Sequence, residues 1–255
     1  MAPILNISTY RFVPLDDLPA LRDTLHQRAA ALQLKGTVLL AEEGINLFLA
    51  GPAEGVNAWL DALRADARFA GLEAKESWSD STPFKRLKVK IKREIIRMNR
   101  PTIRPANGRA PALAPEVLAR WLTQGHDDAG RPVRMLDTRN AFEVDDGAFD
   151  NAIDWRIAKF TEFPDALEAH RTELQDVTVV SYCTGGIRCE KAAILMQDLG
   201  LTNSWQLEGG ILKYLELTTR DGVAPGWHGR CFVFDERVGL DPALHPAPAS
   251  AGAAA

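Results

Sequence analysis

Strand-like and helix-like segments alternate from residue 116 onward, and this alternation constrains the fold more than any other sequence feature. In the helix-like segments apolar residues recur at three- and four-residue steps, as Ala192, Leu195, Met196 and Leu199 do. We expect helices at 116–123, 165–174, 190–199 and 211–217, and strands at 133–136, 177–182 and 204–207. Such alternation predicts an α/β domain in which a parallel sheet is flanked by helices.

The first hundred residues have a different order of elements. An extended apolar run at 5–12 precedes a helix that places Leu21, Leu25 and Leu32 on one face. Two strands at 37–41 and 45–50 follow, joined by a turn in which Gly44 supplies an unusual backbone angle. A second helix at 56–63 and one or two further strands complete the order β-α-β-β-α-β, which predicts a ferredoxin-like, acylphosphatase-like domain.

Prolines and a glycine interrupt both periodicities at residues 99–115. We therefore expect an N-terminal domain at 1–98, a linker at 99–115, an α/β domain at 116–220 and a C-terminal extension at 221–245. Residues 246–255 are almost entirely Ala, Pro, Ser and Gly, a composition that predicts disorder.

Charge is segregated along the chain. The formal net charge is -4, yet residues 85–104 contain nine cationic side chains against the single carboxylate of Glu94. A strand at 87–91 would bury Leu87 and Val89 and present lysines on its other face, which would suit the phosphates of an RNA. The alternative is a solvated sheet face. The candidate RNA-binding residues are Lys85, Arg86, Lys88, Lys90, Lys92, Arg93, Arg97 and Arg100.

A cysteine-containing loop joins the expected strand at 177–182 to the expected helix at 190–199. Ligand sites of parallel sheets collect at such strand ends, and consecutive glycines let backbone N–H groups turn inward around an anion. The dipole of the following helix and Arg188 would lower the pKa of the Cys183 thiol, which makes Cys183 the expected nucleophile or persulfide carrier. The cradle around Cys183 and Arg188 is expected to comprise Thr184, Gly185, Gly186, Ile187 and Cys189.

The length of this loop separates two chemistries. Cysteine phosphatases use a C-x5-R loop wide enough for a phosphate, whereas Arg188 follows Cys183 as C-x4-R. The pattern C-x-x-G-x-R resembles that of rhodaneses, and Asp137-Thr138-Arg139 resembles their D-x-R element. For Asp137 and Arg139 a structural ion pair that supports the site is favoured over a catalytic role.

Four longer sequence motifs resemble those of the bacterial tRNA uridine hydroxylase family. They are residues 40–46 (LAEEGIN), 183–192 (CTGGIRCEKA), 209–214 (GGILKY) and 231–235 (CFVFD), and the resemblance runs from about residue 5 to 240. It implies oxygen-dependent hydroxylation of the wobble uridine of tRNA to 5-hydroxyuridine, with a rhodanese-like domain carrying the active cysteine at Cys183. Molecular oxygen and an unidentified reductant are the implied co-substrates, and no cofactor or metal site is evident in the sequence.

Two other functions stay open: a sulfurtransferase that carries a persulfide on Cys183, and an RNA-binding module with a degenerate rhodanese domain. Cys189 could resolve an oxidised Cys183, although a small helix-start residue is favoured. Trp155, Phe160 and Phe163 are candidates for stacking on a base, with packing as their favoured role. We expect a cytoplasmic protein without a membrane segment, whose partner is the anticodon region of tRNA; the sequence leaves the oligomeric state open.

Overall fold

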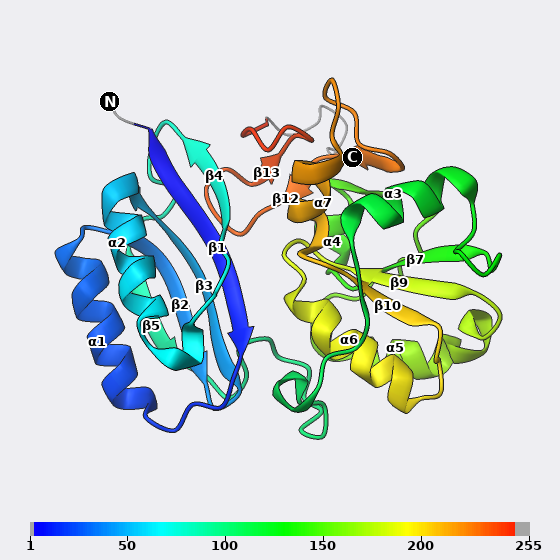
Figure 1. The fold of residues 1–255 in the computed structure, drawn as a ribbon, viewed down its shortest axis with the longest axis horizontal. Helices are drawn as coiled ribbons and strands as arrows, with labels where there is room; N and C mark the ends of the chain where they lie inside the picture. The colour runs from blue at the N-terminus through cyan, green and yellow to red at the C-terminus, as the bar shows by residue number, and fades with distance from the viewer. Residues whose placement is uncertain (1–2, 248–255) are drawn as a thin grey trace. The chain divides into compact units, whose positions relative to one another are not determined.

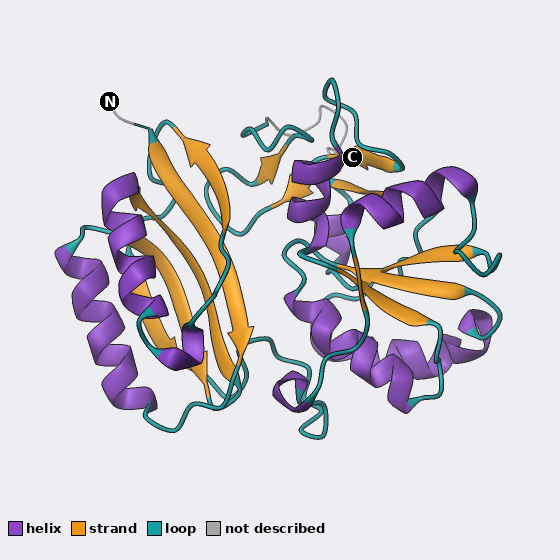
Figure 2. Cartoon of the chain, in the orientation of Figure 1, coloured by secondary structure: helices purple, strands orange, loops and turns teal. Residues whose placement is uncertain are grey.

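A computed structural model describes residues 3–247, and the chain divides into two compact units, Met1–Arg97 and Met98–Ala255 (Figure 1). The two units contain one large sheet each, with helices packed against it (Figure 2). Among the described residues, no helix combines the length and apolar character needed to span a membrane.

The N-terminal unit is a five-stranded sheet with two main helices. Its elements are β1 (Ile4–Phe12), α1 (Leu18–Ala31), β2 (Lys35–Ala41), β3 (Gly44–Pro52), α2 (Ala53–Arg64), the short helix η1 (Ala67–Phe69), β4 (Lys75–Ser79) and β5 (Leu87–Ile91). The strand order is β4-β1-β3-β2-β5, with every neighbouring pair antiparallel except β2 and β5. The first four strands with α1 and α2 form the predicted ferredoxin-like unit, and β5 adds a parallel edge strand.

The core of this unit lies between the sheet and the face that α1 and α2 cover (Figure 1). Leu25 of α1, Trp59 of α2 and Leu47 of β3 are almost fully buried in one apolar cluster. The β2–β3 hairpin closes at Gly44, whose φ is 147° and whose missing Cβ leaves room for the carbonyl oxygen of Arg11. A side chain there would collide with β1, so the predicted need for glycine in this turn is confirmed.

The second unit is built on a four-stranded, all-parallel sheet with the order β6-β10-β9-β7. Its strands are β6 (Ala112–Leu113), β7 (Val133–Asp137), β8 (Gly147–Phe149), β9 (Thr178–Tyr182), β10 (Ser204–Leu207), β11 (Trp227–Gly229), β12 (Cys231–Phe232) and β13 (Gly239–Leu240). Its helices are η2 (Pro105–Asn107), α3 (Pro115–Gln124), α4 (Ala141–Val144), η3 (Phe160–Glu162), α5 (Phe163–His170), η4 (Arg171–Leu174), α6 (Ile187–Asp198) and α7 (Gly210–Thr218). The helices α3 and α7 cover one face of the sheet and α5 and α6 the other (Figure 1). The predicted parallel α/β domain is thereby confirmed.

Two segments outside the expected α/β domain belong to this unit. Residues 112–113, in the segment expected as a linker, form β6 and pair in parallel with residues 206–207 of β10. In the expected C-terminal extension, β11 pairs with β8 and β12 pairs with β13. Both segments satisfy backbone hydrogen bonds of the domain, which a free linker or tail would not do. Of the tail expected to be disordered, Pro246 bridges to Leu240, and residues 248–255 lie outside the described residues.

Candidate active site

The predicted reactive loop connects the carboxyl end of β9 to the first turn of α6. Tyr182 ends the strand, Cys183 follows it, and Gly186 adopts a φ of 97° at the N-cap of α6. This left-handed conformation is accessible to glycine at low cost, and it turns the Gly186 N–H back toward the cysteine. That N–H donates a hydrogen bond of 3.2 Å to the Cys183 sulfur. The loop therefore turns a backbone N–H toward the sulfur, as an anion cradle requires.

Cys183 ionises readily in this cradle even though its side chain is fully buried. Burial disfavours the thiolate, but a hydrogen bond from Cys189, the charge of Arg188 and the backbone N–H groups of Arg188 and Gly186 outweigh it. Together they lower the pKa of Cys183 to about 5. The sulfur is therefore a thiolate at neutral pH, which is the nucleophilic form of cysteine.

The guanidinium of Arg188 is held by a carboxylate that the sequence reasoning missed. Its two terminal nitrogens donate to the two carboxylate oxygens of Glu143 at 2.6 and 2.7 Å, and both side chains are buried. Glu143 raises the pKa of Arg188 and fixes its planar head beside Cys183. The only sequence signal for Glu143 is the capping box that it forms with Asn140 at the start of α4.

The turn between β10 and α7 supports the cradle from outside. The N–H groups of Ile211 and Leu212 donate to the carbonyl oxygens of Cys183 and Thr184 at 3.0 and 3.1 Å. With these carbonyls occupied, the loop can direct its own N–H groups at the sulfur. Gly210 has a φ of 67°, and a Cβ on it would lie 2.4 Å from the Cys183 carbonyl oxygen. The close approach of the two backbones thus requires glycine at position 210.

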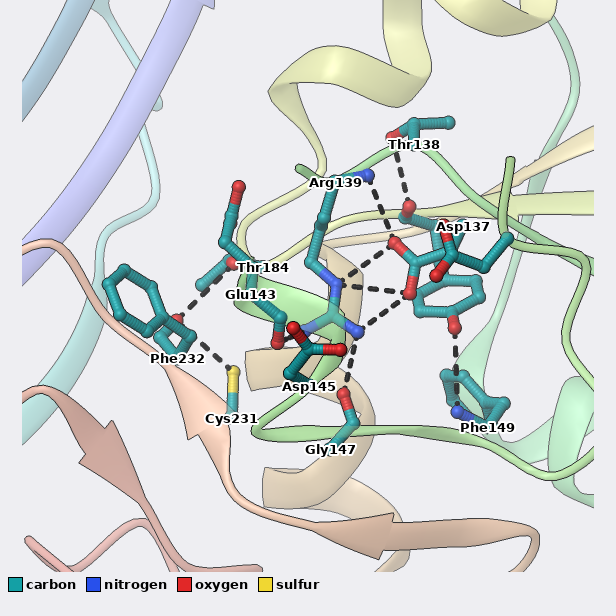
Figure 3. Close-up of polar contacts among 12 residues, drawn as sticks. Asp137, Thr138, Arg139, Glu143, Asp145, Gly147, Phe149, Thr184, Cys231 and Phe232 are labelled. Carbon is teal, nitrogen blue, oxygen red and sulfur yellow. Dashed lines mark hydrogen bonds and ion pairs between the residues drawn. The ribbon is translucent and has the colours of Figure 1, made fainter. Parts of the chain in front are cut away.

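Asp137 and Arg139 form a fully buried ion pair (Figure 3). The guanidinium donates to the Asp137 carboxylate at 2.6 Å and to the carbonyl oxygen of Gly147 at 2.7 Å. It also lies 5.5 Å from the ring centre of Tyr182, the residue that precedes Cys183. These contacts tie β7, β8 and β9 together, so the geometry gives Asp137 and Arg139 a supporting role.

The two other cysteines are thiols in this environment. Burial and the neighbouring Cys183 thiolate raise the pKa of Cys189, which lies 3.8 Å from the Thr138 hydroxyl. Burial raises the pKa of Cys231 to about 12. No disulfide joins the three cysteines. In the part of the chain that the structure describes, no group of three or more His, Cys, Asp or Glu side chains is arranged to hold a metal.

The candidate RNA-binding residues divide between the two units. Lys88 and Lys90 lie on β5, which within residues 3–247 pairs only with β2, and Lys92 follows it; we call these three the β5 lysines. Lys90 and Lys92 are exposed and Lys88 is partly so, which leaves them accessible to a polyanion. Lys85, Arg86, Arg93 and Arg97 are exposed in the same unit, whereas Arg100 belongs to the second unit and pairs with Asp165 at 2.8 Å.

The aromatic residues considered for base stacking are engaged in packing. Phe163 is fully buried and Phe160 is 5% exposed. Trp155 stacks on His170 with ring centres 5.3 Å apart and also contacts Phe163. The exposed aromatic rings of this unit lie elsewhere, on Phe142 and Phe234.

Comparison with known proteins matches both units to described families. Residues 4–95 match the UPF0176 acylphosphatase-like domain, and residues 117–217 match the rhodanese-like domain. A protein of Delftia acidovorans is 68% identical over 248 residues, covering 96% of this chain and 93% of its own length. A protein of Bordetella petrii is 61% identical, and the alignment covers 98% of this chain and 98% of that protein. A protein of Variovorax paradoxus is 60% identical, and the alignment covers 100% of this chain and 95% of that protein. All three carry the name tRNA uridine(34) hydroxylase.

Proposed function

The chain belongs to the tRNA uridine(34) hydroxylase family, and from that membership we propose that it hydroxylates uridine 34 of tRNA with Cys183 as the reacting group. Relatives at 57–68% identity over nearly the whole chain carry this name. The observation that supports Cys183 most strongly is its cradle, in which two backbone N–H groups, a thiol and a guanidinium act on one buried sulfur.

The reaction that we propose converts uridine 34 to 5-hydroxyuridine. One atom of molecular oxygen enters the C5–H bond of the uracil ring and the other leaves as water. The reaction therefore consumes two electrons and two protons, which a reductant supplies. The reductant is a second co-substrate beside oxygen.

The part of this chemistry that the chain supplies is a stable thiolate at the end of β9. With its pKa lowered to about 5, Cys183 is mainly a thiolate at neutral pH. Arg188 stays charged because the Glu143 carboxylate and the Cys183 thiolate raise its pKa against the effect of burial. The site therefore keeps its nucleophile and its cation in fixed relative positions before substrate arrives, which is the preorganisation that catalysis requires.

The N-terminal unit supplies a surface for tRNA in this proposal, with the anticodon region as the part that reaches Cys183. Lys88 and Lys90 lie on the edge strand β5, and Lys92 follows it. At a rise of about 3.3 Å per residue, alternate side chains of a strand are about 6.6 Å apart, which is close to the spacing of successive phosphates. Each phosphate that a lysine neutralises would release a counterion and strengthen binding at low salt.

The test is nucleoside mass spectrometry of tRNA from a bacterium deleted for its own gene of this family. Expression of the chain should restore 5-hydroxyuridine and nucleosides derived from it, whereas an empty vector should not. Sulfur transfer from thiosulfate to cyanide by the purified protein, without any change in the tRNA nucleosides, would instead support a sulfurtransferase. The names of the relatives favour the hydroxylase over that alternative.

A further inference from the structure

Three phenylalanine rings gather on the surface of the rhodanese-like unit beside the reactive loop. Phe142 comes from α4, Phe232 from β12, and Phe234 follows β12. Their ring centres are 5.1 to 6.4 Å apart, and the planes cross at 80 to 88°. Phe142 is 49% exposed and Phe234 is 51% exposed, so the cluster turns apolar ring surface toward solvent. We call these three residues the phenylalanine cluster.

Exposure of this cluster costs hydrophobic free energy that burial would have recovered. A single exposed apolar side chain is ordinary, but adjacent exposed aromatic rings are typical of surfaces that bind a ligand or another macromolecule. The backbone also holds the rings outward. Cys231 and Val233 point into the domain, so the intervening Phe232 and the following Phe234 share the opposite face of the strand.

Two short connections join the cluster to the reactive loop. Phe142 directly precedes Glu143, whose carboxylate binds Arg188 at 2.6 and 2.7 Å. The carbonyl oxygen of Phe232 accepts a hydrogen bond of 3.4 Å from the hydroxyl of Thr184, the residue after Cys183 (Figure 3). Two elements distant in sequence, α4 and β12, thus bring their aromatic residues to the rim of the same loop.

The segment that carries Phe234 is anchored on its far side. The carboxylate of Asp235 accepts hydrogen bonds from the backbone N–H and the guanidinium of Arg237 at 3.0 and 2.6 Å. The N–H of Val233 donates to the carbonyl oxygen of Val238 at 2.8 Å, which closes the turn. Phe234 is therefore presented by an ordered turn, and binding a ligand would require little ordering of the backbone.

We propose that the phenylalanine cluster is the stacking platform that receives the uracil base of uridine 34 and holds it over the Cys183 loop. This rests on the function proposed above, because it takes uridine 34 of an RNA as the ligand. A nucleobase fits the surface because its flat face stacks on aromatic rings and its edge stays free for hydrogen bonds. Enzymes that act on a base must first take it out of its stack, and exposed rings beside the nucleophile compensate the lost stacking.

The burial of Cys183 determines how a base on the phenylalanine cluster could reach the sulfur. The sulfur has no exposed surface, so a base contacts it only after a side chain at the rim moves. The exposed rings of Phe142 and Phe234 can rotate at little cost in packing, whereas Glu143 and Arg188 are fixed by their ion pair. A movement that lets a base approach the sulfur is therefore easier at these rings than at the ion pair that supports the thiolate.

The test is a binding cycle with the full chain and a fluorescent anticodon stem-loop, measured by anisotropy, so that no reductant is needed. Two RNAs are compared, one with uridine at position 34 and one with an abasic residue there. The wild-type protein should bind the uridine RNA roughly 5- to 150-fold more tightly, the range that stacking of one base supports. The double variant Phe142→Ala/Phe234→Ala should lose this preference and bind both RNAs alike.

Two control variants separate stacking from other effects. Phe142→Tyr/Phe234→Tyr keeps the aromatic faces and should keep the preference for uridine. Val223→Ala removes an exposed apolar side chain elsewhere in the unit, where Val223 is 68% exposed, and should also keep it. The double variant Phe142→Ala/Phe234→Ala should unfold at nearly the wild-type temperature, because both rings are half exposed in the folded protein.

Each outcome of the cycle has a distinct meaning. A double Ala variant that still prefers the uridine RNA as strongly as the wild type would overturn the platform, whatever the activity of the protein. A wild-type protein indifferent to the base at position 34 would overturn the platform and also count against the proposed function. Loss of preference in the double Ala variant, together with retention in both controls, would support the platform.

Discussion

Replacement of Cys189 by alanine tests whether the second cysteine of the loop sets the reactivity of the first. Burial raises the pKa of Cys183, and the Cys189 thiol is the first of the groups that outweigh it and lower this pKa to about 5. A hydrogen bond to a charged group contributes about 1.5–3 kcal/mol. At about 1.4 kcal/mol for each pKa unit, its loss should raise the pKa of Cys183 to about 6–7.

The assay is alkylation of Cys183 by iodoacetamide across pH, followed by mass spectrometry of the peptide that contains it. Because only the thiolate reacts, the rate rises with pH through the pKa of Cys183 and then levels off. The wild type should reach half its maximal rate near pH 5 and the Cys189→Ala variant near pH 6–7. At pH 7 the thiolate fraction would then fall from about 99% to between about 50% and 90%.

Cys189→Ser is the matched control because a hydroxyl keeps a donor at the same position. Its midpoint should stay close to that of the wild type. An unchanged midpoint in Cys189→Ala would show that Cys189 is only a small residue at the start of α6, and the account of the pKa of Cys183 would then be wrong in that respect.

Three further perturbations test other parts of the site. Gly210→Ala should displace the loop, because its Cβ would meet the Cys183 carbonyl oxygen, and the alkylation assay should then report a raised pKa of Cys183. The control Gly200→Ala has a similar φ of 83° and no atom within 4 Å of the added Cβ, and it should leave that pKa unchanged. Glu143→Gln should lower the free energy of unfolding in urea by about 3–5 kcal/mol, because it leaves the Arg188 guanidinium buried without its carboxylate; a loss under 1 kcal/mol would contradict this. Replacing the β5 lysines by glutamate should weaken tRNA binding and reduce the magnitude of its salt slope by up to about 0.9 for each lysine that contacts a phosphate, and an unchanged slope would remove β5 from the RNA surface.

The sequence predicts most of the fold because the signals involved are local. Apolar periodicity locates α3, α6 and α7 within about three residues of their observed ends, and alternation of strands and helices fixes the parallel sheet. By contrast, β6 is only two residues long and lies among prolines, so its pairing with β10 has no periodic signal. The same holds for β11, which is recognisable only through its partner β8.

Some residues of the candidate site can likewise be predicted from the local sequence, and others cannot. The cradle of Cys183 follows from residues next to one another in the sequence, so the spacing of cysteine, glycines and arginine predicts it. Glu143 lies 45 residues from Arg188, and nothing in its local sequence names its partner. The sequence favours packing for Trp155, Phe160 and Phe163, and the structure shows them packed. The exposure of Phe142 and Phe234 is decided by tertiary packing and has no signal in the local sequence.

The most direct test of the central claim is the nucleoside composition of tRNA in a deletion strain that expresses single-cysteine variants. The wild type and Cys231→Ala should restore 5-hydroxyuridine-derived nucleosides, because the Cys231 thiol stays protonated and takes no part in the cradle. Cys183→Ala should restore none, with its tRNA indistinguishable from that of the empty vector. Restoration by Cys183→Ala at the level of the wild type would contradict the assignment of Cys183 as the reacting group.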